Sequence, residues 1–237
     1  MDGFSYTNIF ETKGIEYIAV IVFFMALIPF WTYLIKSPAV RRGVQKVMEF
    51  FSFEKLRIPE GIYYDKAHTW TFLEKNGTAS VGADDFLVQL TGAVNLNYLK
   101  QTGDIVKKGE VLAEAEKDGK RLQLVAPVSG EIRKTNEALS ELPELLTEDP
   151  YGKGWIYKVK PHDWKNDTKD HLFADEAKDW SRNEVTRFKD FLSETYAKES
   201  GGTPVLQDGG ELAAHTLSLL PEDVWKNFQQ KFLNPAL

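Results

Sequence analysis

The sequence contains no cysteine, and only four of its 237 residues are histidine. Without cysteine, the chain cannot form a disulfide, bind an iron–sulfur cluster, attach a c-type haem or use a thiol nucleophile. The histidines show neither HxxH nor HExxH spacing, so we expect this chain to build no metal site. They are His68, His162, His171 and His215.

Motifs of catalysis and nucleotide binding are absent as well. The chain has no GxSxG, no Walker loop and no dinucleotide-type glycine loop. Asp84 and Asp85 are interpreted as the cap of a short helix, and His68 as a surface or hydrogen-bonded histidine in a strand. A formal net charge of −6 argues against a nucleic-acid partner. We therefore expect no catalytic residues and no enzymatic activity of this chain alone.

One long hydrophobic run is present. Residues 15–35 read IEYIAVIVFFMALIPFWTYLI, with a single charge at Glu16. As a helix this run would be roughly 32 Å long, which is close to the hydrocarbon thickness of a bilayer. A cleaved signal peptide is the alternative, but its apolar core would be shorter and followed by an A-x-A site. The run predicts a transmembrane helix after a short non-cytoplasmic N-terminus at residues 1–14.

The charges around this run predict its orientation. Before it lie Asp2, Glu11 and Lys13, whereas Lys36, Arg41, Arg42, Lys46, Lys55 and Arg57 follow it. The positive-inside rule places the C-terminal side in the cytoplasm, so we expect a single-pass protein of the inner (cytoplasmic) membrane with its C-terminal domain facing the cytoplasm. Residues 36–57 are predicted to form a basic juxtamembrane helix near anionic lipid; a plain helical connector is the alternative.

The pattern changes at residue 58, and short alternating runs separated by turns continue to residue 161. TWTFLE and GAVNLNYL alternate as strands do, and GADDFLVQLTG predicts a short helix capped by Asp84. These residues resemble the glycine cleavage system H protein family. The resemblance rests on YYDKAHTW, TASVGADDFLVQLTGAV, GDIVKKGEVLAEAE, APVSGEIRKTNEAL and ELPELLTEDPYGKGWIYKVKP, which occur in this order. It implies a mainly β, barrel-sandwich hybrid fold of the lipoyl/biotinyl type over residues 58–161.

The stretch EAEKDGKRLQLVAPVSG predicts a hairpin, because Asp-Gly is favoured where both central residues of a turn need positive φ. Asp118 and Gly119 then form the tip, between Lys117 and Lys120. The family resemblance implies a lipoyl-lysine at such a tip, three residues after a glutamate. Here Glu116 matches the glutamate, and Gly119 occupies the lysine position.

Two hypotheses about the cofactor follow. Glycine cannot accept lipoate, so we expect no cofactor, with Lys117 and Lys120 as solvated residues that close the hairpin. The alternative is lipoylation at Lys117 or Lys120. Use of Lys120 would require the hairpin to shift by one residue, which would turn its side chains to the wrong face.

Residues 162–237 are predicted to form a helical C-terminal extension. Ser181 and Glu184 have the spacing of a capping box that would start a second helix, and a last helix is predicted from Pro221 to Phe232. Helices this few and short cannot form an independent core, so they must pack on the β domain or on another protein.

The sequence favours a membrane-anchored, non-catalytic, H-protein-like subunit that scaffolds or docks a larger membrane complex. Its expected partners are the lipid bilayer and other subunits of that complex; a respiratory or redox complex is suggested by analogy alone. The alternative is a lipoyl-carrying H protein of glycine cleavage or a related dithiol-transfer system.

Overall fold

The computed structural model describes Tyr17 and residues 20–27, 56–200 and 215–234, without the side chains of residues 196–200. Residues 20–27 are helical. Within the described residues, no helix has the length and apolar character needed to cross a membrane. Most of the predicted span at residues 15–35, and nearly all of the predicted helix at 36–57, lie outside the described residues. Both stay predictions.

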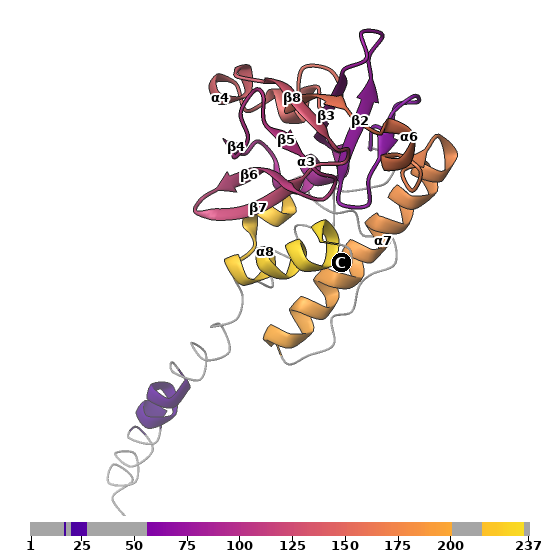
Figure 1. Cartoon of the computed structure of the whole chain (residues 1–237). Coiled ribbons are helices and arrows are strands. Elements are labelled where there is room, and N and C mark those ends of the chain that lie inside the picture. The colour runs from indigo at the N-terminus through magenta and orange to yellow at the C-terminus, as the bar shows by residue number, and fades with distance from the viewer. Residues whose placement is uncertain (1–16, 18–19, 28–55, 201–214, 235–237) are drawn as a thin grey trace, which may run out of the picture. The chain divides into compact units, whose positions relative to one another are not determined.

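Two antiparallel sheets form the body of the domain (Figure 1). The larger has the order β10-β1-β2-β3-β9-β8-β5, and the smaller has the order β4-β6-β7. The strands are β1 Tyr63–Tyr64, β2 Thr69–Leu73, β3 Ala79–Ala83, β4 Asn95–Tyr98, β5 Ile105–Val106, β6 Val111–Lys117, β7 Lys120–Val125, β8 Gly130–Thr135, β9 Tyr157–Pro161 and β10 Leu172–Phe173. The predicted mainly β fold is confirmed.

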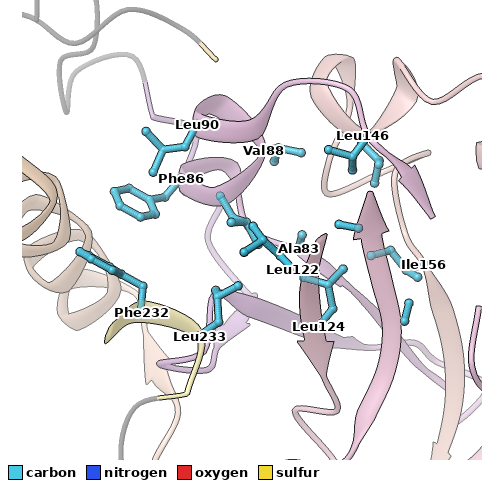
Figure 2. Close-up of a cluster of buried hydrophobic side chains, with 14 of the residues drawn as sticks. Ala83, Phe86, Val88, Leu90, Leu122, Leu124, Leu146, Ile156, Phe232 and Leu233 are labelled. Carbon is cyan, nitrogen blue, oxygen red and sulfur yellow. The ribbon is translucent and has the colours of Figure 1, made fainter. Parts of the chain in front are cut away.

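Alternation along the strands places the apolar side chains in a shared core. Val81, Val159 and Ile132 come from the larger sheet, and Leu122 and Leu124 come from β7; each is 3% exposed or less. Figure 2 shows Leu122 and Leu124 in this cluster, close to α3. Burial of such side chains contributes about 1.5–3 kcal/mol each, so this core is the main source of the domain's stability.

Helices cover this core. They are α3 Asp85–Thr91, α4 Ala138–Glu141, α5 Leu145–Glu148, α6 Trp164–Asp167, α7 Asp175–Ser200, η2 Thr216–Leu219, α8 Glu222–Phe228 and η3 Gln229–Leu233. The predicted cap of α3 is confirmed, because the Asp84 carboxylate accepts a hydrogen bond from the Leu87 N–H at 2.9 Å. Gly92 ends α3 with φ 70°, and a Cβ there would lie 2.4 Å from Nδ1 of His215.

Two details of the C-terminal extension differ from the sequence prediction. The β-sheet continues past Pro161, because β10 pairs with β1 at its edge. The prediction that a second helix starts with a capping box at Ser181 and Glu184 was wrong. These two residues are buried within α7, which is one continuous helix. Of the two packing alternatives, the structure shows the first, because α7, η2, α8 and η3 all pack on the β domain.

A buried ionic cluster joins α7 to the β domain. His68 is fully buried, with Nδ1 2.8 Å from the Asp84 carboxylate and Nε2 3.5 Å from the Glu184 carboxylate on α7. Its ring lies 4.5 Å from that of Phe86 and 4.9 Å from that of Trp180, measured between centroids. The alternating pattern predicts this histidine in a strand. In the structure it lies in the turn before β2, with φ 60°. Of the two expected environments, it has the hydrogen-bonded one.

The two carboxylates keep this buried histidine protonated. Burial alone would lower the pKa of His68, but Asp84 and Glu184 outweigh it and raise the pKa to about 9. The same contact, with Arg187, lowers the pKa of Glu184 despite its burial. An imidazolium between two carboxylates therefore fixes Glu184, and with it α7, against α3.

We expect the stability of the domain to fall at alkaline pH through His68. Because folding raises this pKa, the imidazolium stabilises the folded chain fully below pH 6.5, and the effect is lost as pH rises through about 9. The free energy of unfolding should fall by roughly 3 kcal/mol between about pH 6 and about pH 10, measured by urea denaturation. In His68→Gln this fall should be largely absent; an equal fall in both proteins would contradict the prediction.

Candidate functional site at the β6–β7 hairpin

The β6–β7 hairpin has the predicted turn. Lys117 pairs with Lys120, and the exposed residues between them, Asp118 and Gly119, have φ 51° and 78°. Both values are positive, as a type I′ turn requires. The predicted register and tip are therefore confirmed.

The tip itself is open. A Cβ built on Gly119 meets no atom within 4 Å, so a side chain at this position would project into solvent. Only the positive φ opposes a larger residue there, at a cost of about 1–3 kcal/mol. The hairpin thus has the geometry to present an attached group, but the sequence places no amine at its tip.

Lys117, on the β6 side, is half-buried. Its Nζ donates a hydrogen bond to the carbonyl oxygen of Thr91 at 3.0 Å, at the end of α3. Burial lowers the pKa of Lys117, and Lys120 lowers it further, whereas Asp118 opposes the shift. This amine therefore points toward α3 and away from the tip.

Lys120, on the β7 side, is held by the C-terminal segment. Its Nζ donates to the carbonyl oxygens of Ser218 at 2.5 Å and Leu220 at 3.1 Å. It also lies 5.3 Å from the centroid of the Trp225 ring. Two carbonyls and an aromatic face are together a good environment for an ammonium group. The expectation of two simply solvated lysines was therefore wrong for the immediate surroundings of both amines.

The same segment covers the outer edge of β7. The backbone N–H of Gln123 donates to Oε1 of Gln229 at 2.7 Å, and Nε2 of Gln229 donates to the carbonyl oxygen of Gln123 at 3.3 Å. One side-chain amide thus satisfies both backbone groups of an edge-strand residue. Sequence reasoning missed Gln229, because 106 residues separate it from Gln123 and no local pattern marks the contact.

Aromatic side chains anchor this segment. Phe228 and Phe232 are fully buried and stack with 4.6 Å between ring centroids. Phe232 also lies 6.3 Å from Phe86 and 6.0 Å from Phe188 on α7. Figure 2 shows Phe232 beside Phe86, with Leu233 near Leu122.

No group of three or more acidic or histidine side chains among the described residues is placed to bind a metal.

Comparisons with known proteins agree with the resemblance seen in the sequence. A family model described as "Glycine cleavage H-protein" matches residues 62–183. A Pyrococcus abyssi protein described as "Probable glycine cleavage system H protein" is 40% identical over 119 residues, covering 50% of this chain and 88% of that protein. The chain belongs to the glycine cleavage H-protein family. A glycine cleavage system H protein of Thermus thermophilus is 41% identical over 106 residues, covering 45% of this chain and 82% of that protein.

The crystal structure of a glycine cleavage system H protein from Mycobacterium marinum is 27% identical. It aligns over 61% of this chain and 100% of that chain, with a TM-score of 0.44. The H-protein match to residues 62–183 contains the whole hairpin and continues into α7. Residues 215–234, which hold Lys120 and cover β7, lie outside the matched range.

The carbonyl cradle of Lys120 predicts a stability effect. Replacing Lys120 with Met should lower the free energy of unfolding by about 1–2 kcal/mol, because charged hydrogen bonds to Ser218 and Leu220 are lost. Amide hydrogen exchange should increase in residues 216–225. Lys75→Met, at an exposed lysine of the β2–β3 turn, is the matched control and should change neither quantity. Equal effects of both substitutions would contradict the assigned role of Lys120.

Proposed function

We propose that this chain is a non-catalytic subunit of H-protein fold that acts by binding other proteins and carries no lipoyl group. One observation carries the proposal. The hairpin tip is Gly119, and the amines on either side of it donate hydrogen bonds to backbone carbonyls.

The chemistry of attachment supports this reading. Lipoate is joined to a carrier through an amide bond to a lysine Nζ, and Gly119 has no side chain to form one. Acylation of Lys120 would remove its charge and separate it from the carbonyls of Ser218 and Leu220. Both the ligase and the partner enzymes would also need access to an amine that is hydrogen-bonded to the C-terminal segment.

The second candidate is a lipoyl carrier of glycine cleavage or a related dithiol-transfer system. Membership of the H-protein family favours it more than it favours a membrane scaffold, because the resemblance implies lipoyl carriage. Lys117 is the better acceptor of the two lysines, since a single carbonyl holds its amine and burial lowers its pKa. A lowered pKa increases the fraction of neutral, nucleophilic amine at neutral pH. In either case the chain would transfer or bind rather than catalyse.

The proposed setting is the inner face of the cytoplasmic membrane. Its support is the sequence alone: the apolar run at residues 15–35 and the basic residues that follow it. In this setting the chain would join other subunits of a membrane complex. Analogy alone suggests a respiratory or redox complex. Recovery of the full-length protein from the soluble fraction without detergent would contradict the anchor and leave the hairpin argument unchanged.

Mass spectrometry of the full-length protein, purified from cells that lipoylate their own carriers, tests the two candidates. We expect the unmodified mass, because no lysine occupies the hairpin tip. One lipoyl increment on a peptide containing Lys117 or Lys120 would overturn the proposed function and establish the carrier.

A gain-of-function variant tests the assignment of Gly119. Gly119→Lys should become lipoylated by a lipoate–protein ligase supplied with lipoate and ATP, because its side chain would enter open solvent. Gly77→Lys is the matched control, since Gly77 also has positive φ and open surroundings but lies in another turn. We expect no modification of Gly77→Lys or of the unchanged protein. A folded Gly119→Lys that stays unmodified would show that Gly119 is not the carrier position.

A further inference from the structure

We infer that residues 215–234, here named the C-terminal cap, form a detachable cover that closes the β6–β7 hairpin from within the same chain. The inference concerns the regulation of the hairpin and rests on the proposed function, in which the chain acts by binding other proteins. Figure 1 shows the cap, in yellow, beside β7 and α7.

The cap contacts the hairpin at the backbone of Gln123, which a partner strand would also need, and at the amine of Lys120. Gln229 occupies the backbone N–H and carbonyl of Gln123 on the outer edge of β7. Ser218 and Leu220 supply the carbonyls that hold Lys120. An exposed strand edge is a template for pairing with another chain, so a bound cap excludes such pairing.

The cap is built to open as one unit. Its helical segments have four, seven and five residues, and isolated helices this short are not stable in water. Their structure depends on the buried ring of Trp225 and on the rings of Phe228 and Phe232, which pack against α3 and α7. Loss of this packing should therefore release the polar contacts of Gln229 and the Ser218 carbonyl together.

Fourteen residues, 201–214, join α7 to the cap in the sequence. A released segment that stays attached to its own chain rebinds at a high effective concentration. A cover in the same chain is thus favoured over one contributed by a second copy.

Acylation of lysines measures whether the cap is closed. Full-length protein in mild detergent is treated with the N-hydroxysuccinimide ester of acetate, and modified peptides are followed by mass spectrometry. Lys66 and Lys75 are exposed and serve as reference amines in the same molecule. We expect Lys120 to react at least about tenfold more slowly than the two references, because two carbonyls of the closed cap hold its amine.

Variants of the cap sharpen the test. Phe232→Ala and Gln229→Ala should each accelerate the acylation of Lys120 several-fold, while Lys66 and Lys75 are unaffected. Glu222→Gln, which removes only an exposed ion pair with Lys226 on α8, is the matched control and should leave the rate unchanged. If Phe232→Ala prevents folding, Gln229→Ala still provides the test, because this side chain is not part of the buried aromatic cluster.

Three outcomes would overturn the inference. Lys120 could react as fast as Lys66 in the unchanged protein, which would mean that the cap does not cover it. Its rate could stay slow in a folded Gln229→Ala variant, which would mean that the cap is not detachable. Protection could increase with protein concentration, which would assign the cap to a second copy. A lipoyl group on the native protein would overturn the proposed function instead, and acylation of the unlipoylated fraction would still test the cap.

Discussion

The ionic contact between His68 and Glu184 joins α7 to the β-sheets of this domain. An imidazolium buried between two carboxylates is costly to separate, because removing one partner leaves a buried charge less well compensated. Asp84 is the N-cap of α3. Because His68 lies between Asp84 and Glu184, it connects the start of α3 to α7. The position of α7 relative to the sheets is therefore set by charge as well as by packing.

The packing of residues 215–234 depends on that position. Phe188 and Phe191 on α7 face the core and, with Phe86, form the apolar surface on which Phe228 and Phe232 pack. Once these rings are placed, α8 and η3 lie along β7, and Gln229 reaches its edge. Arg187 connects the ionic cluster to the aromatic cluster, because it pairs with Glu184 and lies 4.3 Å from the centre of the Phe232 ring. A contact near β2 thus determines the surroundings of a hairpin on the other sheet.

Local features of this chain were predictable from its sequence. The Asp-Gly turn, the Asp84 cap and the alternating strands follow from neighbouring residues, and the structure has all three. Features that depend on distant residues were not predictable. Ser181 and Glu184 match a capping box by spacing, but both are buried inside one helix, where Glu184 contacts His68. The contact of Lys120 with Ser218 spans 98 residues, and neither residue carries a local signal of it.

The position of the cap also bears on the proposal that Gly119 stands where a carrier would have its lysine. A carrier hairpin must leave its amine free, whereas the cap uses the charge on the Lys120 amine as a binding determinant. Acylation of this amine would remove the charge that the carbonyls of Ser218 and Leu220 bind, so it would weaken the contact between the cap and the hairpin. With Gly119 at the tip, the turn keeps the positive φ that its backbone conformation needs, and the charge on Lys120 stays available to the cap.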